Sequence, residues 1–186
     1  SNHGGRAGFD IPRLPERLGA VRDTNALAMA LGLGPSDLGF GEFAAENWSA
    51  GNPFTFVPVR GLDAIGRARP DMTRWSAAFG PGDPPGAFIF CREVIDPAHS
   101  YHARMFAPAM GIPEDPATGS AVAAFAGVLA ASGSLGDGQH SFAIEQGHEM
   151  GRPSLLNLWL TISAGKLAVA TVGGDAVIVS EGAIQA

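Results

Sequence analysis

The sequence is poor in cysteine, since Cys91 is the single one among 186 residues. One cysteine cannot form a disulfide within the chain, and it supplies neither a cysteine-based metal site nor a two-thiol catalytic pair. A chain of this length can bury an adequate hydrophobic core without disulfides. We therefore expect a protein of a reducing compartment, most simply the cytoplasm.

The sequence also lacks an excess of positive charge and any long apolar run. Twelve Lys and Arg stand against eighteen Asp and Glu, so the net charge is -6, and the cations are scattered singly. No cationic stripe is present to follow a phosphate backbone, which argues against a nucleic acid partner. No apolar run reaches the roughly 20 residues of a membrane span, and the first residues lack a secretory pattern. We expect no membrane partner.

Glycine and proline are abundant, at 26 and 14 residues, and they mark the breaks between predicted elements. Two prolines in 10–18 predict an extended edge or linker, residues 37–53 predict a loop, and 173–175 predict a tight turn. Asp23 or Thr24 is expected to cap the first helix. The remaining patterns predict helices at 25–31, 62–68 and 72–79, and strands at 54–60, 87–95, 101–107, 141–146, 156–162, 166–172 and 176–180.

The longest predicted helix, at 121–131, has no charged face. A helix that is apolar on all sides is buried on all sides, and its Ala and Gly residues let strands approach closely. One such helix among about seven strands predicts an α+β fold, in which a curled, mostly antiparallel sheet wraps around a central buried helix.

The stretch "EDPATGSA" at 114–121 leads directly into this helix. A helix N-terminus presents backbone N–H groups without helical partners and a positive dipole end, so it can hold an anion. Thr118, Gly119 and Ser120 offer short side chains and close access to the backbone, while Glu114 and Asp115 lie within reach of a bound ligand. Helix capping explains the same residues. The sequence alone leaves capping and ligand binding open.

A second stretch, "IEQGHEMGRPSLLNL" at 144–158, supplies lower-ranked candidates. Gln146, next to Gly147, is expected to bond backbone groups of a turn. Arg152 can hold a carboxylate at a cleft rim, although an arginine in such a loop is more often a surface partner or brace.

Two other kinds of site are disfavoured. Ser120 follows T-G, and this order does not fit the G-x-S-x-G elbow of a serine hydrolase. The histidines lack the H-E-x-x-H spacing of a zinc helix, so we expect no metal site.

The stretches "ARMFAPAMGIPEDPATGSA" (103–121), "IEQGHEMGRPSLLNL" (144–158) and "VATVGGDAVIVSEG" (169–182) resemble the C-terminal half of the PhzF-like isomerase family. This family is named for phenazine biosynthesis and is related in fold to diaminopimelate epimerase. The resemblance covers about residues 45–182. It implies two similar lobes, each a sheet curled around a central helix, with the substrate held between two facing helix N-termini.

The resemblance also implies roles for the residues of the first stretch. Asp115 would be the catalytic carboxylate that binds substrate or assists proton transfer. Gly119 and Ser120 would hold the substrate's carboxylate, Thr118 would support them as a cap, and Glu114 would belong to the same binding set. The implied reaction is an isomerisation of a small carboxylate-bearing metabolite, by general acid/base proton transfer without a cofactor.

The sequence departs from the family in its first part. Neither the main proton-transferring Glu nor the Gly-His motif of the N-terminal lobe is found in residues 1–110. We therefore interpret residues 1–44 as a remnant of that lobe plus a linker helix, and residues 45–186 as the C-terminal lobe. Little or no turnover is expected from this chain alone. The alternative is a non-catalytic single-lobe module that binds carboxylates or dimerises, and the expected partners are a second copy or a complementary N-terminal lobe.

Overall fold

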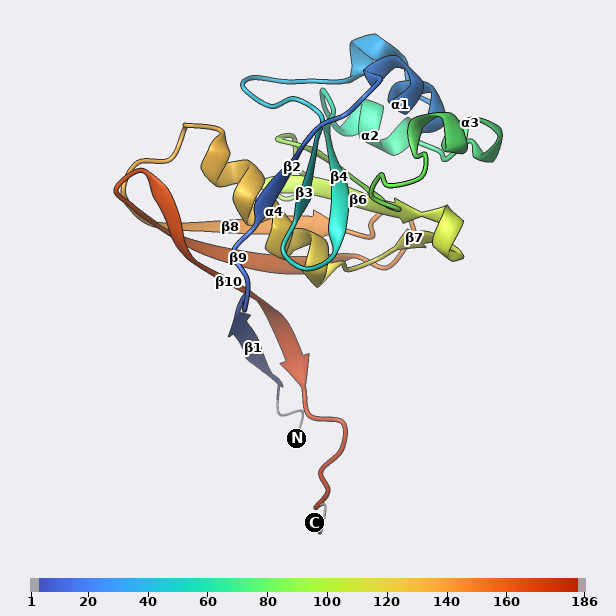
Figure 1. The fold of residues 1–186 in the computed structure, drawn as a ribbon. Helices are drawn as coiled ribbons and strands as arrows, with labels where there is room; N and C mark the ends of the chain where they lie inside the picture. Colours follow the sequence, from blue (N-terminus) through green and yellow to red (C-terminus); the bar gives the residue numbers. More distant parts are fainter. Residues whose placement is uncertain (1–3, 184–186) are drawn as a thin grey trace.

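The computed structural model describes residues 4–183 and contains a ten-stranded sheet that curls around one long helix, α4 (Figure 1). The strand order is β1-β10-β9-β8-β6-β5-β4-β3-β2, and β7 pairs with β6 outside this path. The strands are β1 (Gly4–Asp10), β2 (Glu16–Ala20), β3 (Glu46–Ser49), β4 (Pro53–Pro58), β5 (Ala87–Cys91), β6 (Tyr101–Ala107), β7 (Ile112–Asp115), β8 (Gly138–Gln146), β9 (Ser154–Ser163) and β10 (Lys166–Val177).

Most neighbouring strands are antiparallel, and two pairs, β4 with β5 and β6 with β8, are parallel. The helices are α1 (Thr24–Ala30), α2 (Leu62–Arg67), α3 (Met72–Ala78) and α4 (Gly119–Ala131), with 3-10 turns η1 (Pro35–Asp37) and η2 (Pro108–Met110). This architecture confirms the predicted α+β fold with a curled, mostly antiparallel sheet around a buried helix. None of the helices in residues 4–183 is both long and apolar enough to cross a membrane.

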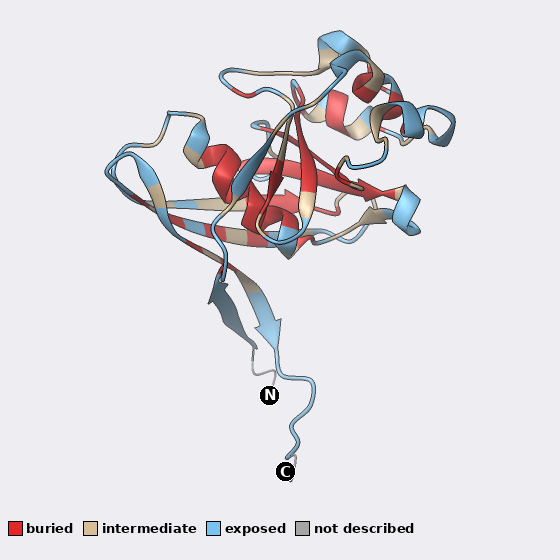
Figure 2. Cartoon of the chain, in the orientation of Figure 1, coloured by how far each residue is buried: buried red, intermediate tan, exposed pale blue. Residues whose placement is uncertain are grey.

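Helix α4 is the centre of the main core, as Figure 2 shows by its burial. Every residue from Ala121 to Leu129 is buried, so the helix has no solvent face over that length. The ring of Phe125 stacks on Phe56 and meets Phe90 edge to face, and full burial of one such side chain contributes about 1.5–3 kcal/mol. A helix enclosed in this way holds its N-terminus in a fixed place.

A second, smaller core lies between the sheet and the three short helices α1, α2 and α3. Trp75 of α3 and Ile65 of α2 pack there with Ile89 of β5 and Phe106 of β6. Asp23 accepts hydrogen bonds from the first amides of α1, which confirms one of the two predicted caps. Strands β5 and β6 are therefore covered on both faces, and Figure 2 shows them as buried along their length.

Several predicted boundaries were wrong. The predicted loop at 37–53 contains β3, which pairs with β2 and β4, and the predicted strand at 87–95 ends at Cys91. By contrast, the segment 10–18, predicted as an extended edge or linker, does contain the start of the edge strand β2, whose register shifts after Arg17. Short strands of four or five residues carry too little periodicity to be recognised before their partners are known.

The predicted turn at 173–175 was also wrong, because β10 continues through it and pairs with β1. A Cβ atom on Gly173 would lie 2.6 Å from the carbonyl oxygen of Ala7. The glycines therefore permit a close approach of β1 rather than a reversal of the chain. The resulting β1–β10 ribbon projects from the rest of the sheet (Figure 1).

Candidate functional site

The first part of the site is the N-terminal end of α4, here called the helix mouth (residues 115–120). Thr118 occupies the N-cap position, but no side chain forms a capping hydrogen bond there. The N–H groups of Ala121 and Val122 both donate to the Thr118 carbonyl, at 3.1 and 3.0 Å. The amides of Gly119 and Ser120 precede these bonds, so they are the ones that can meet a ligand.

The side chains around the mouth brace one another. The Thr118 hydroxyl donates to Asp115 Oδ2 at 2.8 Å instead of capping the helix. Gln146 accepts from the Thr118 N–H through Oε1 at 3.1 Å, and its Nε2 donates to the Asp115 carbonyl at 2.6 Å. Gln146 thus bonds backbone groups of the mouth, whereas the sequence analysis expected these bonds in the turn after β8. The half-buried Asp115 is held from two sides.

The turn after β8 lies against the segment that enters α4. Gly147 has a φ of +80°, and a Cβ there would clash with the Arg152 carbonyl and lie 2.8 Å from the Pro116 carbonyl oxygen. The Arg152 N–H donates to the Gly147 carbonyl at 2.9 Å, while the residue itself is exposed. Only glycine combines this backbone conformation with this close approach.

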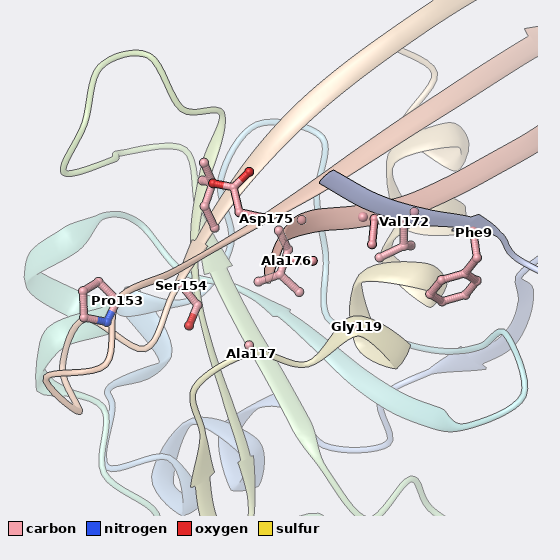
Figure 3. A pocket seen from close by; sticks show the side chains of 14 residues that line it. Phe9, Ala117, Gly119, Pro153, Ser154, Val172, Asp175 and Ala176 are labelled. Carbon is pink, nitrogen blue, oxygen red and sulfur yellow. The ribbon is translucent and has the colours of Figure 1, made fainter. Parts of the chain in front are cut away.

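A pocket of about 740 Å³ lies beside the mouth, between β1, β9, β10 and the start of α4 (Figure 3). Among the sequence-predicted residues that the structure describes, only Gly119 lines it. Its walls are mostly small or apolar, with Ser154 and Asp175 as side chains that carry oxygen. The lining residues are Ala7, Gly8, Phe9, Ala117, Gly119, Pro153, Ser154, Leu155, Leu156, Val172, Gly173, Gly174, Asp175 and Ala176.

Among the predicted residues that do not line this pocket, Ser120 and Glu114 differ in their surroundings. Ser120 is an exposed residue of the mouth, whereas Glu114 lies against Arg104, whose Nε and Nη2 donate to its two carboxylate oxygens at 2.8 and 2.9 Å. Adjacent residues of a strand point to opposite faces. In β7, Asp115 and Glu114 therefore point to opposite sides, and the structure does not bring Glu114 to the mouth.

Sequence reasoning missed the group of charged residues on that other face. We call it the ionic cluster, and its members are His99, His102, Arg104, Glu114, Glu145 and Glu149. The alternation of polar and apolar residues in "YHARMFA" was the available signal, since His102 and Arg104 occupy every second place in a fully buried strand. Arg104 Nη1 also donates to the carbonyls of Ile65 and Ala68 at the end of α2.

The cluster shifts the pKa values of its members in opposite directions. Burial disfavours charge on Glu145, but hydrogen bonds from two backbone amides and two imidazoles lower its pKa to about 2. Burial likewise opposes charge on His102, yet bonding to Glu149 and Glu145 raises its pKa. Burial also disfavours charge on Glu149, but the hydrogen bond and charge of His102, together with a backbone hydrogen bond and the charge of Arg104, lower its pKa. Glu145, His102 and Glu149 are therefore stabilised in their charged forms.

Residues 4–183 favour neither a metal site nor a reactive thiol. No group of His, Cys, Asp and Glu there has the arrangement to hold a metal ion. Cys91 is buried, and this burial, with a contribution from Glu93, raises the pKa of its thiol to about 12. A thiol that stays protonated is a poor nucleophile.

Residues 9–182 match the model of the PhzC-PhzF family, described as phenazine biosynthesis-like proteins. The chain belongs to this family. The match begins at residue 9, ahead of the resemblance over 45–182, so it includes β2 and α1 as well as the helix mouth.

Related sequences and structures agree with this assignment. An uncharacterized isomerase of Mesorhizobium japonicum is 44% identical over 98% of this chain and 62% of the relative. The trans-2,3-dihydro-3-hydroxyanthranilate isomerase of Pseudomonas fluorescens is 33% identical over 96% of this chain and 58% of the relative. A PhzF-family structure from Bacillus anthracis has a TM-score of 0.77 at 23% identity, over 93% of this chain and 58% of that chain. The chain thus spans about three fifths of these proteins.

Proposed function

We propose that this chain forms one side of an isomerase site that moves a proton on a small carboxylate-bearing metabolite, without a cofactor. The observation that supports this is the mouth of α4, which lacks a side-chain cap and opens beside a pocket of about 740 Å³. The amides of Gly119 and Ser120, with the exposed Ser120 hydroxyl, would accept the substrate carboxylate.

The chemistry follows from where negative charge develops. When a carbon conjugated to a carboxylate loses a proton to a base, the electron pair spreads onto the carboxylate oxygens, and the same molecule then regains a proton at another carbon. Preorganised amides and a positive helix end stabilise that charge. We assign Asp115 to proton transfer, because only its Oδ2 is engaged by a described side chain and the residue is held in place.

The relatives support a carboxylate substrate class. Relatives from Pseudomonas are named trans-2,3-dihydro-3-hydroxyanthranilate isomerases, and an anthranilate carries a ring and a carboxylate. The small and apolar pocket lining, from Ala7 to Val172, suits an uncharged ring next to the anion-binding amides. We extend only the class, a small acid with an apolar body, to this chain.

The relatives' greater length supports a two-lobe site. We propose that residues 1–44 are a remnant of a first lobe with a linker helix, that residues 45–186 form the second lobe, and that a complementary lobe supplies the opposing acid/base glutamate. We also propose a cytoplasmic location, with which the buried free thiol of Cys91 agrees. Loss of one acid/base group alone typically lowers turnover by about 10² to 10⁴.

Calorimetric titration with benzoate, an apolar ring with one carboxylate, tests the helix mouth. We expect Ser120→Ala to weaken binding by about 2- to 10-fold, as for the loss of one hydrogen bond. Asp115→Asn tests the same region. Ser134→Ala is the matched control, because it makes the same change near the other end of α4. If both mouth variants keep the wild-type affinity, the residues serve only to begin the helix.

A non-catalytic module that binds carboxylates or dimerises is the second candidate. The observation that favours it is the projecting β1–β10 ribbon, on which Phe9 and Val177 are each 57% exposed. Exposed apolar groups of this kind favour association with a second copy. Native mass measurement distinguishes a homodimer from a monomer, and deuterium uptake from solvent into a ligand C–H bond would exclude the non-catalytic candidate.

A further inference from the structure

Strands β6 and β8 connect the ionic cluster to the helix mouth. They pair in parallel, with His102 beside Glu145 and Ala103 beside Gln146. Side chains alternate between the two faces, so Glu145 points into the cluster while its neighbour Gln146 braces the mouth. A displacement of this part of β8 therefore reaches both sites.

Glu145 is the fixed anion of the cluster. Its fully buried carboxylate accepts from the backbone N–H groups of Ile95 and Asp96 at 2.9 and 2.7 Å. It also lies 2.7 Å from His99 Nδ1 and 2.8 Å from His102 Nδ1. Four donors around one carboxylate keep it ionised and immobile.

His102 lies between two carboxylates. Its Nδ1 is 2.8 Å from Glu145 Oε2, and its Nε2 is 2.9 Å from Glu149 Oε1. A carboxylate only accepts hydrogen bonds, and imidazole carries a proton on both nitrogens only as the cation. With both carboxylates ionised, these two contacts require a protonated His102.

The charged and titratable groups that face His102 come from several elements. Glu145 on β8 and Glu149 after it bond to the ring, and Arg104 on β6 lies 3.8 Å from Glu149. The ring centroids of His148 and His102 are 5.4 Å apart. Cys91 on β5 is the cross-strand neighbour of His102. The two contacting carboxylates favour the cation, while burial of the ring opposes it.

Glu149 belongs to the turn 147–152, which follows β8 directly. The turn is closed by hydrogen bonds from Gly151 to His148 at 3.0 Å and from Arg152 to Gly147 at 2.9 Å. It packs through Gly147 against Pro116 and continues into Pro153 and Ser154, which line the pocket. The imidazole bond to Glu149 therefore ties the turn to the rigid strand β6.

Resting on the proposed function, we propose that His102 is a positioning residue of the α4 site. As an imidazolium that bridges Glu145 and Glu149, it holds the turn 147–152 against Pro116 and fixes one side of the pocket. Loss of one ring proton leaves a lone pair facing Glu149. The turn then opens, and the helix mouth loses its support without a change elsewhere in the sheet.

Amide hydrogen exchange of this chain tests the proposal without any ligand. We expect His102→Gln to speed exchange in 148–152 by about tenfold or more, as for the loss of a charged hydrogen bond, while the central amides of β9 stay unchanged. His99→Gln is the matched control, because it removes a donor to Glu145 but no bond to the turn. Equal effects of the two variants, or faster exchange throughout the chain, would overturn the proposal.

Two further measurements keep the proposal testable if His102→Gln does not fold. Glu149→Gln changes a side chain that is 17% exposed, whereas the side chain of His102 is fully buried. This variant should speed amide hydrogen exchange in the same turn. Nitrogen NMR of the wild type should show both His102 ring nitrogens protonated at pH 6, and a neutral ring there would contradict the bridge.

Benzoate titration separates this proposal from the proposed function. If the proposed function and the bridge both hold, His102→Gln should bind benzoate about 3- to 10-fold more weakly than the wild type. The wild type should show a similar loss of benzoate affinity when the pH is raised above the titration of His102. If wild-type protein does not bind benzoate but the turn still opens in His102→Gln, the proposed function fails while the bridge stands. If benzoate binds equally well to wild type and His102→Gln, the positioning role is wrong.

Discussion

The helix mouth and the ionic cluster lie on opposite faces of the same strands, and they treat charge in opposite ways. In the cluster, the carboxylates of Glu145 and Glu114 have donors on both oxygens. At the mouth, the first amides of α4 have no side-chain cap. Completed bonds fix a structure, whereas exposed donors at a helix end can recognise a ligand. The ionic cluster therefore supports the fold, and ligand recognition is what we propose for the mouth.

The largest expected effect comes from a substitution in the ionic cluster. Arg104→Met should destabilise the chain by about 3–5 kcal/mol, because it leaves the Glu114 carboxylate without its side-chain donor and removes one of the donors to the Ile65 and Ala68 carbonyls. Urea unfolding measures this free energy. Arg67→Met is the control, since Arg67 forms exposed ion pairs that contribute about 0–1 kcal/mol. Similar losses of unfolding free energy in the two variants would show that burial does not strengthen the Arg104–Glu114 pair.

The next largest effect tests the contact between the two regions. Gly147→Ala should cost about 1–3 kcal/mol more than Gly151→Ala, because both glycines have positive φ but only Gly147 is packed against backbone oxygens. Thermal and urea unfolding of the pair give the difference. A difference near zero would mean that the turn can move away from Pro116 without loss.

The cluster should also give stability a defined pH dependence. The folded pKa of Glu145, about 2, is below its ordinary value, so its contribution is complete above about 4.5 and is lost as pH falls towards 2. The folded pKa of His102 is raised, so its contribution is complete below about 6.5 and is lost as pH rises through the folded value. The free energy of unfolding should therefore decrease below about pH 4.5 and again above about pH 6.5. Stability that stays constant from pH 5 down to pH 2 would contradict the role of Glu145.

The smallest expected effect comes from a glycine in α2. Gly66→Ala should stabilise the chain by up to about 1 kcal/mol, because a Cβ there meets no atom within 4 Å and alanine favours a helix. Gly127→Ala in α4 makes the same change where the Cβ would lie 2.5 Å from Trp48 Cε3, and it should destabilise instead. Melting temperatures that shift in the same direction would show that α4 is less tightly enclosed.

Much of the fold was predictable because it depends on local sequence patterns. The charge-free run of α4, the Gly and Pro breaks and the alternating strands gave the α+β class and the helix mouth. That Gln146 bonds backbone groups was foreseen, but its partners at the mouth were not, because they lie 28 and 31 positions away in the chain. The short strand β3 and the continuation of β10 through Gly173 were not, because pairing with distant strands decides them.

The sequence by itself determined the buried helix, the fold class and the family, since these depend on local composition and on motifs that lie contiguously in the chain. Only the tertiary structure decided that Asp115 and Glu114 point to opposite faces, and that His102 lies between Glu145 and Glu149. These groups are 43 and 47 positions from His102, and only the pairing of β6 with β8 brings them together. A hydrogen bond requires contact in space, and separation along the chain does not reveal it.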